Sequence, residues 1–307
     1  MRGFSRVPSA SPEVNPNKMT EPVPDPSTPL RRSVLRRLTI AQLSTHLARF
    51  TSADPRFVRA LKRDPRDGVQ RLAVQLQARQ AAVAREAARL DGLFALEREH
   101  LAQGFTVIAG VDEVGVAPLA GPVVAAAVIL PAGVSLPELD DSKRLTAAQR
   151  DALYAQITAC AVAFRIGMAT VEEIDRLNIL QATRLAHRRA ILGLPVRPQL
   201  ALIDGLYAAD VPVPQLVIVD GDATCASIAA ASVVAKVTRD RMMTTLGREF
   251  PHYGFDRHKG YGTKEHRAAI RRYGVTPAHR RSFHTVRAHQ ELLQLRIADG
   301  ALRIGRA

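Results

Sequence analysis

Cysteine is scarce in this chain, and long apolar runs are missing. Cys160 and Cys225 are the only cysteines among 307 residues, and neither stands at a zinc-binding spacing. The sequence therefore predicts neither a disulfide framework nor a zinc site, and a reducing compartment suits it best. No run approaches the about 18–20 apolar residues that cross a bilayer, and the beginning lacks the apolar core of a secretion signal. We expect a monomeric cytoplasmic protein that is not exported and has no membrane partner.

Acidic residues are also outnumbered. The chain has 43 Lys and Arg against 29 Asp and Glu, a formal net charge of +14 and a pI of about 10.7. Such a balance favours a polyanionic partner, and nucleic acid is the leading candidate. A basic background that only keeps the protein soluble remains the alternative, because net charge says nothing about chemistry.

The chain divides into four segments of different composition. Residues 1–32 are rich in Pro and Ser with little apolar periodicity, which predicts a disordered tail. In residues 33–103 leucines recur at helical spacing, which predicts a helical N-terminal extension. Residues 104–250 alternate between strand and helix patterns and are expected to form the main domain. Residues 251–307 are basic and are expected to form a helical C-terminal segment.

Strand-like and helix-like patterns alternate after Gly104. Short apolar runs predict strands at residues 106–111, 123–130, 162–168, 200–203 and 216–219. Amphipathic stretches predict helices that begin at the cap Thr146 and end near 158, run from 171 to about 191, and run from about 227 to 250. Two strands followed by strand-helix alternation indicate an α/β sandwich with a mixed sheet.

Four carboxylates follow predicted strands. Asp112 and Glu113 follow the first strand, and Asp204 and Asp222 follow the two later ones. Strands of the same sense end at one edge of an α/β sheet, so these side chains could converge there on two hard cations. Taken singly, each could be an ordinary turn residue. Together, in a basic protein, they favour metal-assisted phosphoryl chemistry.

A series of spaced motifs supports that interpretation. In chain order they are GVDEVG at 110–115, PLAGPVV at 118–124, DSK at 141–143, LIDG at 202–205, GDA at 221–223, SIAAAS at 227–232, AKVTRDR at 235–241 and HKGYGT at 258–263. This series resembles the ribonuclease HII family, the type 2 ribonucleases H. The stretch DPRDGVQ at 64–70 also resembles the helical N-terminal region of some bacterial members, though less specifically.

The resemblance implies a ribonuclease H-like mixed sheet flanked by helices. It implies cleavage of the RNA strand of RNA–DNA hybrids, and often of DNA that contains single ribonucleotides, leaving 5′-phosphate and 3′-hydroxyl ends. The metal ligands would be Asp112, Glu113, Asp204 and Asp222, holding two Mg²⁺ or Mn²⁺ ions. Segment 251–307 would complete the substrate groove.

Substrate contacts are carried over from the same motifs. Lys143 and Lys236 are expected to contact phosphates, and Tyr261 is expected to stack at the RNA–DNA junction. The alternatives are plain surface lysines and a tyrosine packed in the core. Solvation or phosphate contact, and not catalysis, is expected for four histidines: His252, His258, His266 and His284.

Two positions depart from the family pattern. Gly115-Val116-Ala117 stands where members usually have Gly-Arg-Gly, a loop associated with reading the 2′-hydroxyl. Asp220 stands where lysine is common. These departures put recognition of single ribonucleotides in doubt and leave an alternative function open, a hybrid-binding protein with little or no cleavage. A third alternative is another nuclease or recombinase on the same fold. Such a protein would not require the segment around Tyr261, so the presence of that segment argues against it.

Overall fold

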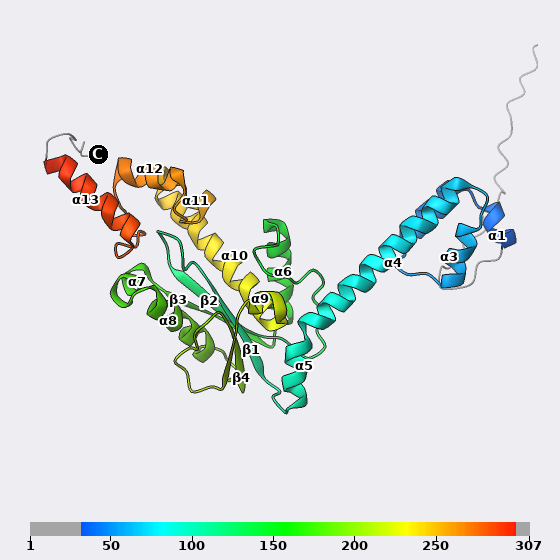
Figure 1. Ribbon diagram of the computed structural model, residues 1–307, viewed down its shortest axis with the longest axis horizontal. Helices are drawn as coiled ribbons and strands as arrows, with labels where there is room; N and C mark the ends of the chain where they lie inside the picture. Colours follow the sequence, from blue (N-terminus) through cyan, green and yellow to red (C-terminus); the bar gives the residue numbers. More distant parts are fainter. Residues whose placement is uncertain (1–31, 299–307) are drawn as a thin grey trace, which may run out of the picture. The chain divides into compact units, whose positions relative to one another are not determined.

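The computed structural model describes residues 32–298, with side chains from 33 to 291. The predicted tail therefore lies almost wholly outside the described residues. The chain forms two compact units that divide between Arg85 and Glu86, inside one long helix (Figure 1). No helix among the described residues is long and apolar enough to span a membrane.

The first unit is helical. It contains α1 (Arg32–Arg37), α2 (Ile40–Leu47), α3 (Pro55–Lys62) and the first part of α4 (Asp67–Leu93). Thr39 and Gln42 form a capping box that starts α2, and the Asp54 side chain caps α3, which begins at a proline. The apolar faces meet in a separate core that includes Leu43, Phe57 and Leu76.

The second unit is built on a five-stranded mixed sheet, as the sequence predicts. Its strands are β1 (Ile108–Val114), β2 (Val123–Ile129), β3 (Ala163–Ala169), β4 (Leu200–Asp204) and β5 (Gln215–Ile218). They lie in the order β3-β2-β1-β4-β5. The pairs β1–β2 and β2–β3 are antiparallel, whereas β1–β4 and β4–β5 are parallel.

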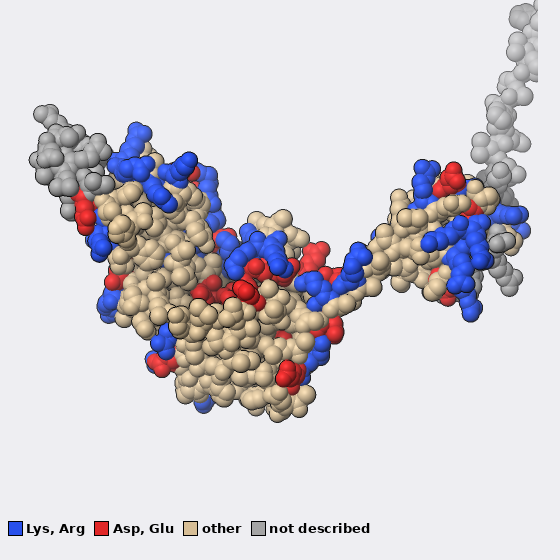
Figure 2. All heavy atoms as spheres, viewed as in Figure 1, with Lys and Arg blue, Asp and Glu red and all other residues tan. Residues whose placement is uncertain are grey.

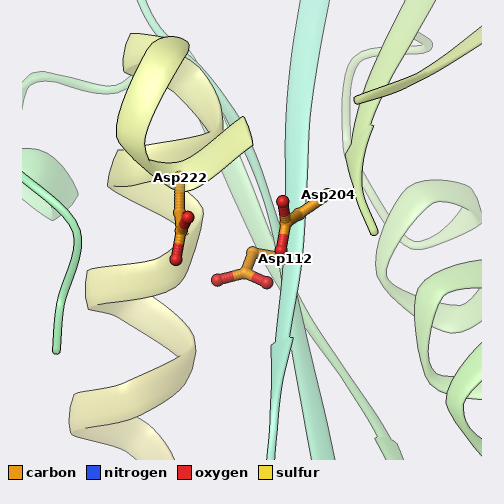
Figure 3. A group of neighbouring side chains, drawn as sticks. All are labelled: Asp112, Asp204 and Asp222. Carbon is orange, nitrogen blue, oxygen red and sulfur yellow. The ribbon is translucent and has the colours of Figure 1, made fainter. Parts of the chain in front are cut away.

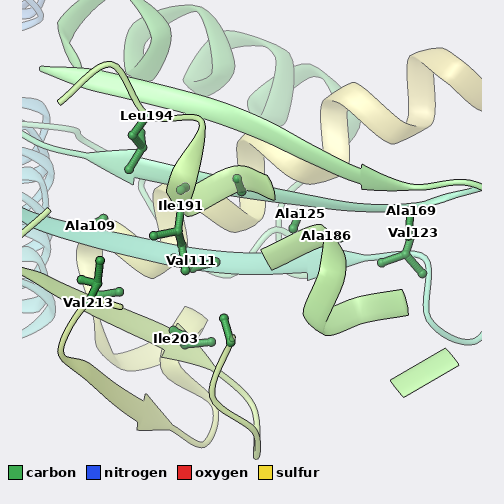
Figure 4. Packing of buried hydrophobic residues seen from close by; sticks show 14 of the residues in the cluster. Ala109, Val111, Val123, Ala125, Ala169, Ala186, Ile191, Leu194, Ile203 and Val213 are labelled. Carbon is green, nitrogen blue, oxygen red and sulfur yellow. The ribbon is translucent and has the colours of Figure 1, made fainter. Parts of the chain in front are cut away.

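Helices cover both faces of this sheet. On one face lie α6 (Ala147–Cys160) and α10 (Ala226–Glu249), whose apolar side chains pack with those of β2. On the other face lie α7 (Val171–Leu177) and α8 (Ile179–Leu192), and Figure 4 shows the core that they share with the sheet. Many of these core residues are alanines, so the layers approach closely.

Two glycines permit the closest approaches. A Cβ atom at Gly110 of β1 would lie 2.0 Å from the carbonyl carbon of Ser227 on α10. A Cβ atom at Gly167 of β3 would lie 2.0 Å from the carbonyl oxygen of Ala186 on α8. Gly110 therefore lets α10 lie directly against β1, beside the carboxylates that follow it.

The predicted single helix over 171–191 is wrong in one respect. Asn178 has a positive φ of 72°, which ends α7 and begins α8. Its side chain then accepts a hydrogen bond from the Gln181 amide at 3.1 Å, so it caps the second helix. Asparagine tolerates positive φ better than most residues, which is why the break falls there.

The remaining elements complete the second unit. They are α5 (Ala95–Ala102), α9 (Gly221–Thr224), a 3₁₀ turn (Pro251–Tyr253), α11 (Phe255–His258), α12 (Lys264–Tyr273) and α13 (His284–Ala298). Tyr253, Phe255 and Ile270 of the C-terminal elements share a core with Leu119 and Met243. This core ties the C-terminal segment to the loop that follows β1.

The close approach at Gly110 generates a stability prediction. Gly110→Ala should lower the free energy of unfolding by about 1–3 kcal/mol or more, because the new methyl group meets backbone that cannot rotate away. Gly92→Ala in α4 is the matched control, since nothing lies within 4 Å of its Cβ position. It should be neutral or stabilising. Urea unfolding of both variants measures the difference, and equal stabilities would contradict the packing.

Candidate metal centre and substrate-binding loops

Three aspartates meet where β1, β4 and α9 come together. Asp112 lies on β1, Asp204 ends β4 and Asp222 lies on α9. One carboxylate oxygen from each lies within 4.8 Å of the others, and Figure 3 shows the side chains converging. Only 6% of Asp112 and 3% of Asp222 are exposed. This acidic cluster offers only oxygen ligands, which suit a hard divalent cation.

The parallel pairing of β1 with β4 brings two of these residues together. Val111 pairs with Ile203, so the next residues along each strand, Asp112 and Asp204, are neighbours at the same sheet edge. The Gly221 amide donates a hydrogen bond to Asp204 Oδ1 at 2.7 Å, which holds α9 and its aspartate against the end of β4.

The predicted end of the first strand at residue 111 is wrong. β1 continues to Val114 because Val114 still pairs with Val124 of β2. Asp112 and Glu113 therefore lie within the strand, and not beyond it. Successive strand residues point to opposite faces, so the two carboxylates leave the sheet on different sides.

The acidic cluster is electrostatically unfavourable by itself. Burial, followed by the charges of Glu113 and Asp204, raises the pKa of Asp112 well above its ordinary value. Burial also raises the pKa of Asp204, with a further contribution from Asp222. Both shifts mean that negative charge here is poorly compensated by the protein, so a bound cation would stabilise it.

Lys143 supplies the nearest positive charge. Its ammonium lies 2.8 Å from Asp222 Oδ2 and 3.8 Å from Asp141 Oδ1. Burial lowers the pKa of Lys143, but the hydrogen bond to Asp222 and the negative charges of Asp222, Asp141 and Asp112 together outweigh this, and the net shift is upward. The structure thus places this residue against the acidic cluster, where it is still largely open to solvent.

Glu113 is not part of the group of three. Its Oε2 lies 2.9 Å from Nε2 of His187, which is buried on α8. The sequence interpretation did not identify His187. The available signal was a single histidine among the buried residues of α8, which are otherwise Ala182, Thr183, Ala186, Ala190 and Ile191.

A buried arginine holds the backbone of the loop after β1. Arg280 donates hydrogen bonds to the carbonyls of Gly115, Val116 and Gly121. Burial lowers its pKa to about 9. The loop therefore has a fixed backbone, and the Val116 side chain is 37% exposed. Although Arg280 belongs to the basic C-terminal segment, it is internal and cannot face a nucleic acid.

Tyr261 is accessible to a ligand, with 43% of it exposed. The alternative that it packs in the core is therefore wrong. A second buried arginine, Arg239, links its loop to the loop after β1, because it donates to the carbonyls of Lys259, Ala120 and Pro122.

The expectation of solvation or phosphate contact is wrong for His266. Thr276 N–H donates to Nδ1 of His279, whose Nε2 lies 3.1 Å from Nε2 of His266. Nδ1 of His266 in turn lies 2.9 Å from the Tyr261 carbonyl oxygen. One N–H hydrogen on each ring is enough to form every hydrogen bond in this series. Both histidines are therefore neutral, and they support the Tyr261 loop. Burial lowers the pKa of His266 to about 4 and that of His279 to about 3.

Lys236 and Asp220 are not drawn into the acidic cluster. Nζ of Lys236 forms an ion pair with Asp240, one turn further along α10, at 2.7 Å. Asp220 precedes α9 and has a positive φ of 53°.

Comparison with known proteins identifies the family of this chain. A sequence model described as Ribonuclease HII matches residues 109–286, and one described as Ribonuclease HII N-terminal domain matches residues 39–101. A protein named Ribonuclease HII from Geobacillus kaustophilus is 51% identical over 82% of this chain and 96% of its own length. The chain belongs to the ribonuclease HII family. Another ribonuclease HII, from Myxococcus xanthus, is 48% identical over 82% of this chain and 88% of its own length.

Solved structures agree on the fold of this ribonuclease HII family member. The ribonuclease H2 of Pyrococcus horikoshii is similar with a TM-score of 0.53 and 25% identity, covering 61% of this chain and 99% of that one. A mutant of Bst-RNase HIII is similar with a TM-score of 0.52 over 63% of this chain and 72% of that one. At 19% identity, the latter likeness shows the fold alone.

The two buried histidines predict a loss of stability in mild acid. An unfolded histidine gains a proton near pH 6.5, but His266 and His279 resist protonation until their folded pKa values of about 4 and about 3. The free energy of unfolding should therefore fall by about 2 kcal/mol per ring between about pH 6.5 and pH 4.5. Urea unfolding measures the total, and NMR titration of the ring protons isolates these two. Titration of either ring near pH 6.5 would contradict the buried chain.

Proposed function

We propose that this protein is a metal-dependent endonuclease that hydrolyses the RNA strand of RNA–DNA hybrids. The observation that carries the proposal is the acidic cluster of Asp112, Asp204 and Asp222 within 4.8 Å, in a chain of the ribonuclease HII family. Together with Glu113 these residues would hold two divalent cations, Mg²⁺ or Mn²⁺. We also propose that the protein acts as a cytoplasmic monomer.

The chain's own residues would position the scissile phosphodiester and the attacking water. When bound, the cations would lower the pKa of that water and stabilise the leaving oxygen. Water attacks phosphorus, the bond to the 3′ oxygen breaks, and the products carry 5′-phosphate and 3′-hydroxyl ends. Lys143, beside Asp222, can exchange its carboxylate partner for a substrate phosphate because its side chain is open to solvent.

The surface of the second unit suits such a substrate. Figure 2 shows acidic side chains gathered in a hollow with basic side chains at its rim. The C-terminal segment adds further positive charge on α12, from Lys264, Arg267, Arg271 and Arg272. We propose that residues 251–307 complete the substrate groove, with Tyr261 stacking at the RNA–DNA junction and Lys236 contacting a phosphate from α10.

The first unit would add affinity and no chemistry. Residues 33–85 contain eleven Lys and Arg against three Asp, and no Glu, which gives this stretch a net charge of +8. Contacts from these side chains to phosphates would release counterions and strengthen binding at low salt.

Replacing one carboxylate of the acidic cluster tests the proposed chemistry. Asp112→Asn should abolish metal-dependent cleavage of a labelled hybrid while hybrid binding stays near that of the parent. It should also raise the free energy of unfolding at pH 7, since it removes a buried charge whose pKa is raised by burial and by its neighbours. Asp210→Asn is the matched control, because Asp210 is exposed and its ion pair is with Arg188 on the surface. Turnover of the Asp112 variant within a few-fold of the parent would contradict the proposed role of the carboxylates.

Single embedded ribonucleotides should be weaker substrates than long hybrids. A guanidinium beside the scissile phosphate would add a charge-assisted hydrogen bond worth about 1.5–3 kcal/mol, or roughly tenfold to a hundredfold. Val116 cannot make that bond. On a long hybrid, neighbouring ribonucleotides and other basic residues compensate, whereas a single ribonucleotide offers only one 2′-hydroxyl.

The double variant Val116→Arg with Ala117→Gly should restore cleavage of single embedded ribonucleotides. Arg280 holds the carbonyl of residue 116, so a longer side chain there can extend outward from a fixed backbone. Val162→Arg controls for added charge, since Val162 is exposed and precedes β3 at the sheet end away from the acidic cluster. Rates on duplexes with one or four ribonucleotides would be compared. Equal rates for the parent, with no gain in the double variant, would show that the arginine is dispensable.

A further inference from the structure

His187 is buried in the second unit and has one polar partner. It lies on α8 with 3% of its surface exposed, and Nε2 is 2.9 Å from Oε2 of Glu113. Nδ1 is buried and has no hydrogen-bond partner among the described residues.

The surroundings of His187 indicate which ring nitrogen carries the hydrogen. A hydrogen on Nδ1 would be a buried donor without an acceptor, which costs about 1–3 kcal/mol. The favoured form therefore carries its hydrogen on Nε2 and donates it to Glu113. This hydrogen bond holds the Glu113 carboxylate in one orientation.

The geometry of β1 explains why Glu113 needs such a partner. Asp112 faces α10, as does Gly110 two residues earlier, which lies against Ser227. Glu113 points to the opposite face, towards α8, and must reach the sheet edge from there. Its charge contributes to the raised pKa values of Asp112 and Asp204, so it lies near the acidic cluster without joining it.

We infer that His187 is a positioning residue that orients Glu113 for metal binding. It engages Oε2, while Oε1 accepts no hydrogen bond from the described residues and is free for a cation. The inference rests on the proposed role of Glu113 as a metal ligand. Partners that orient metal-binding carboxylates typically change metal affinity or activity by about tenfold to a hundredfold when removed.

Packing alone does not require a histidine at this place. The neighbouring positions on the same face of α8 are small and apolar or make local bonds; Thr183, for example, bonds back to the Ile179 carbonyl. An aliphatic side chain at position 187 would fill the space without an unpaired Nδ1. The hydrogen bond to Glu113 is the feature that only the histidine supplies.

The experiment compares four variants with the parent. His187→Leu removes the hydrogen bond, His187→Gln places an amide N–H where Nε2 stood, and His187→Asn has an amide too short to reach Glu113. Thr183→Val, one turn earlier on α8, controls for changes in helix packing. Mn²⁺ binding to the metal-free full-length protein is measured by calorimetry without substrate, alongside thermal unfolding and the Mn²⁺ dependence of hybrid cleavage.

We expect His187→Leu and His187→Asn to bind Mn²⁺ about tenfold more weakly than the parent, with His187→Gln and Thr183→Val within about threefold of it. The same order should appear in the Mn²⁺ concentration for half-maximal cleavage. If His187→Leu does not fold, the comparison of Gln with Asn decides the matter. Equal Mn²⁺ affinities for those two variants would overturn the inference. A parent that binds Mn²⁺ but cleaves no hybrid would refute the proposed function, while the order of affinities would still test His187.

Discussion

Electrostatic repulsion between Asp112, Asp204 and Asp222 is the constraint on which the second unit depends. Three carboxylates within 4.8 Å, two of them almost fully buried, oppose folding unless something compensates them. The protein supplies only part of the compensation, through the Lys143 ammonium and the backbone amides of Glu113 and Gly221. The remaining charge would attract a divalent cation, at a local cost in stability.

The rest of the fold holds these charges in place. Parallel pairing of β1 with β4 makes Asp112 and Asp204 neighbours, and Gly110 lets α10 lie against β1 so that α9 can present Asp222. The buried guanidiniums of Arg239 and Arg280 join the loop after β1 to the C-terminal segment through carbonyl groups alone. Neutral histidines then support the Tyr261 loop. The loop after β1 and the Tyr261 loop are thus fixed by internal polar groups and not by apolar packing alone.

Much of this could be predicted from the sequence, because apolar runs and caps are local signals. The sheet and its covering helices were predicted in this way, and three of the four predicted carboxylates do lie together. What could not be predicted depends on partners distant in the chain. The extension of β1 depends on pairing with β2, and His187 meets Glu113 across 74 positions. The break at Asn178 depends on a positive φ that the helical pattern around it does not reveal.

Anomalous diffraction at the manganese edge, from crystals of the full-length protein soaked in Mn²⁺, tests the central claim most directly. The account predicts an anomalous peak within coordination distance of Asp112, Asp204 and Asp222, and none there in crystals of Asp112→Asn. A parent crystal with no peak at the acidic cluster, or with manganese only at other carboxylates, would contradict it.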